Sequence, residues 1–310
     1  MSKSIRAVPS NTVMGDIPGR SLNTEQIGFI GLGKIGLPIC KNLIERGVSV
    51  FGYKRGSLSQ FEDIGGIAAS SPADVAQQAQ TIFSCLPNES ALDDVMGGPF
   101  GLVESAQPGQ IFVEFGSHAT PVKQRYAQLF AEKGAVLLDG EVSGTPGMVE
   151  QRKAYIYLAG DAEAATKVEP IIRKISDLYI FLGGFGAATR VKLVNNMLVA
   201  LNIAGTAQAM AVGLQFDIDP NKLFEAISKG SGGSTQFNIR APWMTGRIFT
   251  PVQGTAEGLL KHLDGFRELA VEGRVETHLV DCILNIYRSA VSVIGERDVA
   301  ALVDYFAPRV

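Results

Sequence analysis

The feature that most limits how this chain can fold is a glycine-rich turn between a short apolar run and a helical pattern. The apolar run covers residues 27–30, the turn GLGKIG covers 31–36, and the helical pattern covers 38–46. A second apolar run at 48–53 completes a unit of strand, turn, helix and strand. In that setting the spacing G-x-G-x-x-G is typical of a turn that binds the pyrophosphate of a dinucleotide. The unit therefore predicts a Rossmann-type α/β domain.

Each glycine of the turn has its own physical task. Gly31 permits the tight turn, Gly33 lets a pyrophosphate approach the backbone, and Gly36 lets the helix pack closely on the strand. The first N–H groups of the helix then face the phosphates. The cofactor-binding residues expected in the turn are Gly31, Leu32, Gly33, Lys34 and Ile35. The alternative is a glycine turn with a purely structural purpose.

The end of the second strand indicates which cofactor is preferred. An NAD site usually has an acid there, about twenty residues beyond the glycines, that binds the ribose 2′-hydroxyl. This chain has Tyr53, Lys54 and Arg55 at that point, and no acid precedes Glu62. Because an ammonium and a guanidinium suit a 2′-phosphate, we predict NADP as the cofactor, with NAD as a second possibility. The alternative is a basic turn that is merely solvated.

The pattern of elements changes partway along the chain. Strands and helices alternate as far as residue 182, and only helical patterns follow residue 214, which predicts an open sheet of roughly seven or eight strands and then a bundle. The expected fold is an α/β Rossmann-type N-terminal domain and an all-α C-terminal domain joined by a long interdomain helix. The expected ranges are a flexible extension at 1–25, the Rossmann domain at 26–188, the interdomain helix at 189–214 and the helical domain at 215–310.

Three short segments follow predicted strands. They are 86–88, 116–118 and 143–145, and the last comes after a strand expected at 136–139. Ligands in open α/β sheets bind beyond the carboxyl ends of the strands. We therefore expect these segments to line one crevice with the glycine turn.

Residues 183–215 combine a glycine-rich opening with a run that carries no charge from Leu193 to Phe216. This composition predicts a long helix buried on nearly every side. Lys192 and Asn196 are four residues apart and share one face, so they are candidates for a proton donor and a substrate anchor. The alternatives are a membrane span, in which the interrupting amides would be costly, and a lysine that is merely solvated.

Composition argues against several classes of protein. The net charge is −3 and no basic run occurs, so no nucleic-acid partner is expected. A membrane partner is not expected, because a nucleotide-binding unit precedes the apolar run and an amphipathic helical domain follows it. The 3 cysteines are far apart and the 3 histidines lack ligand spacing, so we expect no metal site and a cytoplasmic protein. Residues 1–24 lack the apolar core of a secretory signal, and a flexible extension is expected, with a transit peptide as the alternative.

Several ordered segments resemble the β-hydroxyacid dehydrogenase family, which includes 3-hydroxyisobutyrate dehydrogenase and tartronate, glyoxylate and succinic semialdehyde reductases, and is more distantly related to 6-phosphogluconate dehydrogenase. The segments are the turn at 31–36, Val142-Ser143-Gly144, the stretch 183–196 that ends in K-x-x-N-N, and Lys261. The resemblance implies that Lys192 is the general acid or base. The implied substrate-binding residues are Ser143, Gly144 and Asn196. The implied cofactor-binding residues outside the turn are Leu86, Pro87 and Lys261. Lys54 and Arg55 at the end of the second strand and Ser117 at a later strand end complete the expected set.

The chain departs from the family pattern near the substrate segment. Glu141 replaces the usual proline, Thr145 replaces a glycine, charged residues occupy 150–153, and His262 replaces the acid after the lysine. Glu141 would repel a carboxylate if it faced the site. His118 is either a second proton relay or a loop histidine.

The resemblance implies an NADP-dependent oxidoreductase that interconverts a small β-hydroxy acid and its semialdehyde or oxo acid. One alternative is an enzyme like the imine reductases, a group that generally lacks the lysine found here at 192. Another is a non-catalytic NADP-binding sensor. Small residues along the long helix predict close packing against a second copy, as a homodimer or homotetramer; they are Ala200, Ala204, Gly205, Ala207, Ala209 and Ala211.

Overall fold

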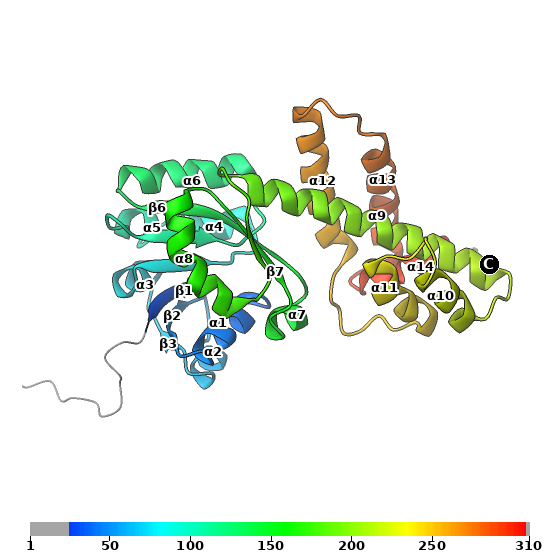
Figure 1. The fold of residues 1–310 in the computed structure, drawn as a ribbon, viewed down its shortest axis with the longest axis horizontal. Helices are drawn as coiled ribbons and strands as arrows, with labels where there is room; N and C mark the ends of the chain where they lie inside the picture. The colour runs from blue at the N-terminus through cyan, green and yellow to red at the C-terminus, as the bar shows by residue number, and fades with distance from the viewer. Residues whose placement is uncertain (1–24, 308–310) are drawn as a thin grey trace, which may run out of the picture.

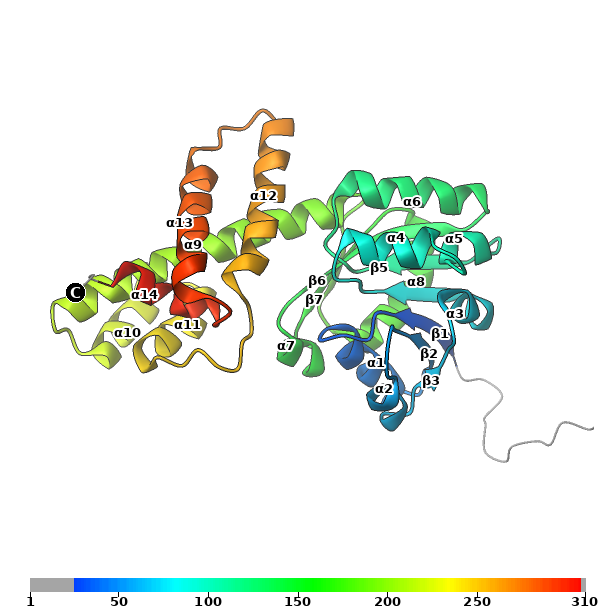
Figure 2. The same ribbon diagram turned by 180° about the vertical axis from the view of Figure 1, so that it is seen from behind.

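The computed structural model describes residues 25–307. The expectations for the first two dozen residues, a flexible extension or a transit peptide, lie outside this range. The described chain forms a sheet-containing body and a helical body, with one long helix running from the first into the second (Figure 1). The view from behind shows the same division (Figure 2). The predicted fold class is confirmed.

The first body is built on an 8-stranded sheet in the order β3-β2-β1-β4-β5-β6-β7-β8. Every neighbouring pair is parallel except β6 and β7. The order reverses between β1 and β4, which is where a doubly wound sheet opens a crevice. The strands are β1 (Gln26–Ile30), β2 (Ser49–Tyr53), β3 (Ile67–Ala68), β4 (Thr81–Ser84), β5 (Ile111–Glu114), β6 (Val136–Ser143), β7 (Tyr155–Ala159) and β8 (Tyr179–Phe181).

Helices cover both faces of the sheet, and each face has its own apolar core. One core packs α1 and α8 against the strands, and the other packs α3, α4, α5 and α6. Since both faces are covered, the strands are rich in apolar residues, as expected for a parallel sheet, although β5 and β6 also contain buried acids. The helices of this body are α1 (Gly36–Ile44), α2 (Ser59–Asp63), α3 (Pro72–Gln78), α4 (Glu89–Gly97), α5 (Leu102–Ser105), α6 (Thr120–Glu132), α7 (Pro146–Glu150) and α8 (Ala162–Ile175).

The strand expected at 136–139 continues to Ser143. The reason is tertiary: antiparallel β7 pairs with β6 from Asp139 as far as Ser143. Glu141 and Val142 are therefore strand residues with side chains on opposite faces of the sheet, and they do not belong to a loop.

The long helix is α9 (Ala187–Gln215), 29 residues in length. The expectation that it is buried on nearly every side is wrong, because Val194, Leu198 and Val212 are about half exposed. The helix is long and apolar enough to cross a membrane, but half of its most apolar window is buried inside the protein.

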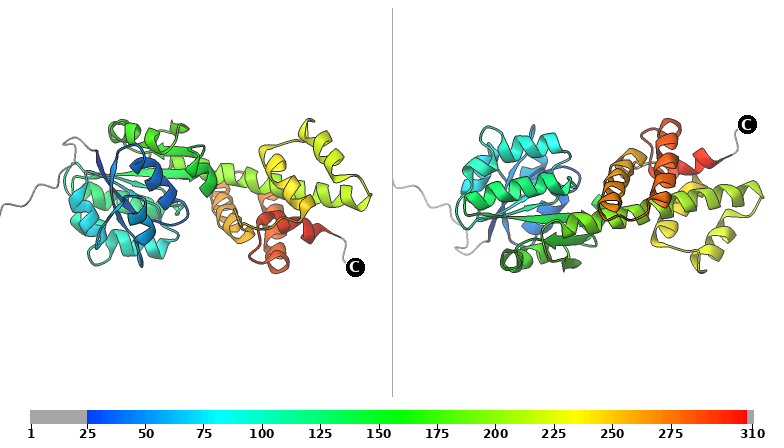
Figure 3. Two further views of the ribbon diagram at one scale, coloured as in Figure 1. Left: turned by 90° about the horizontal axis from the view of Figure 1, so that it is seen from below. Right: turned by 90° about the horizontal axis from the view of Figure 1, so that it is seen from above.

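The helical body packs around the second half of α9 (Figure 3). Of the small residues expected to face a second copy, Ala200, Ala204, Ala207 and Ala211 are instead buried in the core of this body. These four alanines thus allow close packing of helices within the chain. The remaining helices are α10 (Pro220–Ser228), α11 (Thr235–Gly246), α12 (Ala256–Glu272), α13 (His278–Ile294), a short 3₁₀ turn (Val299–Ala301) and α14 (Leu302–Phe306).

One buried ion pair organises the loops at the base of the helical body. Asp298 is fully buried and accepts a hydrogen bond of 2.6 Å from the guanidinium of Arg240. Its carboxylate also accepts bonds from the N–H groups of Gln253, Gly254 and Ala300. A single carboxylate therefore neutralises a buried cation and satisfies donors in two loops.

Replacing this carboxylate should destabilise the fold. Asp298→Ala leaves Arg240 buried without its partner, which should lower the free energy of unfolding by about 3–5 kcal/mol. Urea titration followed by circular dichroism measures the change. The control is Asp281→Ala, which removes an exposed ion pair of 2.6 Å with Arg267 and should cost at most about 1 kcal/mol. Equal costs for the two variants would contradict the argument.

Candidate functional site

A cavity of about 810 Å³ opens at the carboxyl ends of β1, β4 and β5 and reaches α9 and α12. Most of the residues singled out in the sequence line it. They are Gly31, Leu32, Gly33, Lys34, Ile35, Lys54, Arg55, Leu86, Pro87, Ser117, Gly144, Lys192 and Lys261. Ser143 and Asn196 are not among its lining residues.

The glycine turn has the geometry that a pyrophosphate requires. Gly31 has a φ of +94°, and a Cβ there would lie 2.2 Å from the carbonyl oxygen of Cys85. A Cβ at Gly36 would lie 2.0 Å from the oxygen of Gly31, so the helix can start this close to the strand only with glycine. At Gly33 a Cβ would meet no atom within 4 Å, and this residue lines the cavity. The open space above Gly33 and the first N–H groups of α1 fit a dinucleotide phosphate.

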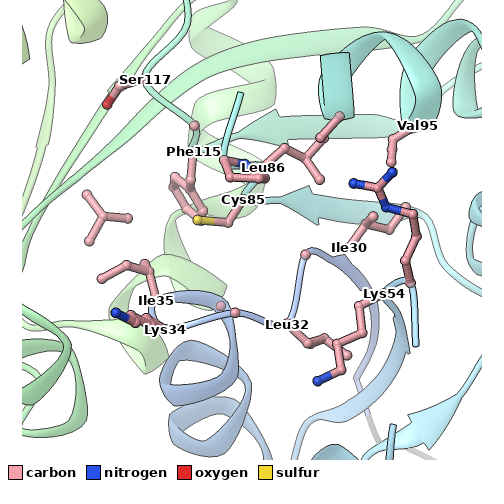
Figure 4. A pocket seen from close by; sticks show the side chains of 18 of the residues that line it. Ile30, Leu32, Lys34, Ile35, Lys54, Cys85, Leu86, Val95, Phe115 and Ser117 are labelled. Carbon is pink, nitrogen blue, oxygen red and sulfur yellow. The ribbon is translucent and has the colours of Figure 1, made fainter. Parts of the chain in front are cut away.

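Figure 4 shows the cavity from close by, with Lys54 and Ser117 at opposite ends. Cys85, Leu86 and Phe115 form the wall that faces the glycine turn. At the Lys54 end, the guanidinium of Arg55 lies 3.6 Å from Asp94, and both side chains are largely exposed. A weak exposed pair of this kind leaves the guanidinium available to a phosphate.

Lys192 lies in the cavity wall near its Ser117 end. Its Nζ donates a hydrogen bond of 2.9 Å to the carbonyl oxygen of Val142, which also lines the cavity. Burial lowers the pKa of Lys192, and the negative charge of Glu141 opposes this shift only in part. An ammonium with a lowered pKa gives up its proton more readily near neutral pH, as a general acid must.

Ser143 and Asn196 are both hydrogen-bonded to Asn195, a residue that was not among the site residues expected from the sequence. The side-chain amide of Asn195 donates to the Ser143 hydroxyl at 3.4 Å and to the Asn196 oxygen at 3.2 Å. Asn196 itself is buried. The Asn195-Asn196 pair after the lysine was the available signal, but only the packing of α9 on β6 shows which amide reaches the serine.

A buried polar cluster lies behind Lys192, centred on Lys123 of α6. Lys123 is 1% exposed, and its ammonium lies 3.0 Å from Asp139 and 3.4 Å from Glu141. Asp139 also accepts bonds from the N–H and the hydroxyl of Thr189, at 3.0 and 2.7 Å. Burial by itself would lower the pKa of Lys123. The negative charges of the nearby carboxylates have the larger combined effect, so the pKa is raised. Sequence reasoning missed this cluster, although acids inside the apolar run 136–143 pointed to it.

Glu141 points toward this cluster and does not line the large cavity. Its carboxylate accepts a hydrogen bond of 2.7 Å from Ser117. Burial raises the pKa of Glu141, and the nearby charges of Lys123 and Lys192 act against that shift. A substrate carboxylate beside Gly144 would therefore be separated from Glu141 by the strand.

The two histidines near the site differ in their surroundings. His118 is buried, and its Nε2 lies 3.5 Å from Glu114, too far for a good hydrogen bond. Neither of its ring nitrogens has a partner within residues 25–307. His262 lines the cavity with Lys192 and Lys261; burial, followed by the charges of these lysines, lowers its pKa to about 4. His262 is therefore neutral near pH 7.

Comparison with known proteins identifies the two parts of the chain. Residues 26–184 match the family described as the NAD binding domain of 6-phosphogluconate dehydrogenase. Residues 186–306 match the family described as the NAD-binding region of NADP-dependent 3-hydroxyisobutyrate dehydrogenase. The two matches cover both bodies of the structure.

Individual relatives agree with these matches. L-threonate dehydrogenase of Cupriavidus necator is 28% identical over 232 residues, 74% of this chain and 78% of that enzyme. 2-(Hydroxymethyl)glutarate dehydrogenase of Eubacterium barkeri is 31% identical over 211 residues, 67% of this chain and 70% of that enzyme. The crystal structure of 3-hydroxyisobutyrate dehydrogenase from Salmonella typhimurium shares the fold, with a TM-score of 0.82 and 21% identity over 91% of this chain and 100% of that one.

The lowered pKa of His262 predicts a loss of stability in acid. His262 takes up a proton near pH 6.5 in the unfolded chain and only near pH 4 in the folded chain. Its contribution to the free energy of unfolding is therefore complete above about pH 6.5 and is lost as the pH falls toward about 4. His262→Gln removes this titration, so the free energy of unfolding should fall less between about pH 7 and about pH 5 than it does in the unmodified chain. The difference should be only on the order of 1 kcal/mol, since the ring is partly exposed. Urea midpoints at both pH values measure it. His278→Gln, at an exposed histidine, is the control and should behave as the unmodified chain does.

Proposed function

We propose that this chain, which belongs to the β-hydroxyacid dehydrogenase family, interconverts a small β-hydroxy acid and its semialdehyde or oxo acid, with NADP as the preferred cofactor. It is an NAD(P)-dependent oxidoreductase that acts on CH–OH groups, as its relatives are. The observation that carries the proposal is the position of Lys192, whose ammonium stands in the wall of the cavity that the glycine turn opens.

The cofactor would lie along the large cavity. The turn residues Gly31 to Ile35 would bind its pyrophosphate through backbone N–H groups, and Lys54 and Arg55 would bind the 2′-phosphate. Leu86 and Pro87 would border the adenosine side, and Lys261 would close over the cofactor from α12. When bound, the nicotinamide supplies or accepts the hydride.

Lys192 would transfer the proton. In the reductive direction its ammonium donates a proton to the carbonyl oxygen of the substrate, and in the oxidative direction the neutral amine accepts it. The carbonyl oxygen of Val142 holds the ammonium in place at 2.9 Å until a substrate oxygen competes for it. Ser143, Gly144 and Asn196 would hold the carboxylate and hydroxyl of the substrate. Gly144 supports this by lining the cavity, and Asn195 links the other two.

Lys192 also separates this function from its alternatives. A substrate oxygen needs a proton donor at this position, whereas the imine reductase group generally lacks the lysine. A sensor that binds NADP without catalysis has no need of an ammonium with a lowered pKa beside the cofactor. We further propose a cytoplasmic homodimer or homotetramer; the exposed apolar side chains of Val194, Leu198 and Val212 on α9 support association.

Removing the ammonium should abolish turnover without abolishing cofactor binding. Lys192→Ala should lower kcat by at least ~10²-fold, because the general acid is lost. The assay follows NADPH consumption with glyoxylate and with succinic, tartronate and methylmalonate semialdehydes, and quenching of NADPH fluorescence reports binding. Lys167→Ala, at an exposed lysine paired with Glu163 on α8, is the control. Near-normal turnover by Lys192→Ala would remove the assignment.

The basic pair at the end of β2 should decide between the two cofactors. The unmodified chain should have a higher kcat/KM with NADPH than with NADH. The double variant Lys54→Ala, Arg55→Ala should lose roughly 10-fold or more in kcat/KM with NADPH, since hydrogen bonds to charged groups contribute about 1.5–3 kcal/mol. The value with NADH is the internal control and should change little. Equal use of both cofactors by the unmodified chain would refute the preference.

A further inference from the structure

A second cavity, of about 450 Å³, adjoins the large one on the side of α6 and α12. Ser117, Lys192, Lys261 and His262 line both cavities. Figure 4 places Ser117 at the far end of the large cavity from Lys54. Lys192 can therefore be approached from two directions, and only one of them leads through the cavity assigned to the cofactor.

Two successive residues of β6 each contribute an oxygen-bearing group to a cavity that Lys192 also lines, one group to each cavity. The carbonyl oxygen of Val142 accepts the Lys192 hydrogen bond in the large cavity. The side chain of the preceding residue, Glu141, lines the second cavity together with Lys192. The extension of β6 by β7 produces this arrangement, because successive strand residues face opposite sides.

Glu141 shares the ammonium of Lys123 with other acceptors, although its charge raises the pKa of Lys123 more than that of Asp139 does. Asp139 is closer to that ammonium, at 3.0 Å against 3.4 Å, and it is fully buried. The carbonyl oxygen of Gly140 adds a further acceptor at 3.0 Å. Two buried carboxylates thus surround one fixed ammonium, and the charge of Glu141 acts on Lys192 as well as on Lys123.

The second cavity is suited to hold water. It is far larger than the roughly 30 Å³ that a water molecule occupies in the liquid. Polar and charged side chains line it, among them Ser117, Glu141 and Arg190, and these can bind water. Glu141 is itself only 1% exposed, and Ser117, which lines the cavity and donates a hydrogen bond of 2.7 Å to the Glu141 carboxylate, connects it to water there.

We propose that Glu141 is a positioning residue that supplies the proton of Lys192 from solvent through the second cavity, so that the proton is replaced while substrate and cofactor fill the first. The inference rests on the proposed function. After Lys192 has protonated the substrate oxygen, the carboxylate of Glu141, which is held by Ser117 and Lys123, takes up one proton from water in the second cavity, and the hydroxide that remains leaves to solvent. The carboxyl group formed in this way gives its proton to the neutral amine of Lys192 across the second cavity, which restores both groups to their starting state. Oxidation runs the same steps in reverse.

The directions of the pKa shifts support this geometry. Burial raises the pKa of Glu141 and lowers that of Lys192, so the two values move toward each other and transfer between them becomes less costly. The charged groups that face Glu141 from the packed elements are Lys123 of α6, Asp139 of β6 and Lys192 of α9. The remaining titratable groups of the cavity are Glu89, His118, Arg190, Lys261, His262, Asp264, Glu268 and Glu272.

The test compares Glu141→Gln with Asp139→Asn in the full chain. Both variants remove a buried carboxylate that contacts Lys123, but only Glu141 lines the second cavity. Glu141→Gln should lower kcat for reduction at least ~10-fold above about pH 8 with little change in KM. Its kcat should then rise with the concentration of imidazole buffer, because the small imidazolium ion can enter the cavity and donate a proton near this pH. The unmodified chain and Asp139→Asn should show no such buffer dependence.

A second measurement does not depend on turnover. The titration midpoint of Lys192, followed by NMR of ¹⁵N-labelled lysine, should fall in Glu141→Gln and move less in Asp139→Asn. If Glu141→Gln does not fold, Glu141→Asp replaces it and should retain buffer-independent turnover at a reduced rate. The relay is overturned if Glu141→Gln keeps the unmodified pH profile, or if it loses activity equally at every pH without buffer rescue. If Lys192→Ala turns over normally, it is the proposed function that fails.

Discussion

The burial of a single ammonium group, that of Lys123, governs how the long helix meets the sheet. Removing such a charge from water is costly unless carboxylates and other acceptors surround it. Asp139 of β6 is the nearest acceptor, and the same carboxylate binds the backbone N–H and hydroxyl of Thr189 in the first turn of α9. A carboxylate at a helix N-terminus also interacts favourably with the helix dipole. The cluster thus joins α6, β6 and α9 at one point.

The position of Lys192 follows from this junction. It lies three residues after Thr189 and so projects from the adjacent turn of α9 toward the same edge of β6. There its ammonium meets the carbonyl oxygen of Val142, at the boundary between the two cavities. The burial that lowers its pKa is a consequence of the same packing. Geometry and proton affinity at Lys192 therefore have a common origin in the contact of α9 with the sheet.

The two ends of the large cavity rely on different kinds of interaction. At the glycine turn, backbone geometry decides what can bind, because Cβ atoms at Gly31 and Gly36 would collide with backbone oxygens. At the other end the choice rests on the side chains of Lys54 and Arg55, which extend from the end of β2. The backbone site is rigid and general for dinucleotides, whereas the side-chain site can change with few substitutions.

Local patterns in the sequence determined the Rossmann-type domain, the helical domain and most residues of the large cavity, because a glycine turn, strand ends and a helical i, i+4 pair depend only on nearby residues. Sequence did not reveal the exposed side of α9, the extension of β6 to Ser143 or the cluster of Lys123, Asp139 and Thr189. Each of these depends on partners distant in the chain: the helices around α9, the antiparallel pairing with β7, and the contact of α6 with α9. For the same reason only the tertiary structure decided that Glu141 turns away from the large cavity, since the side of the sheet that a residue faces is settled by pairing between strands.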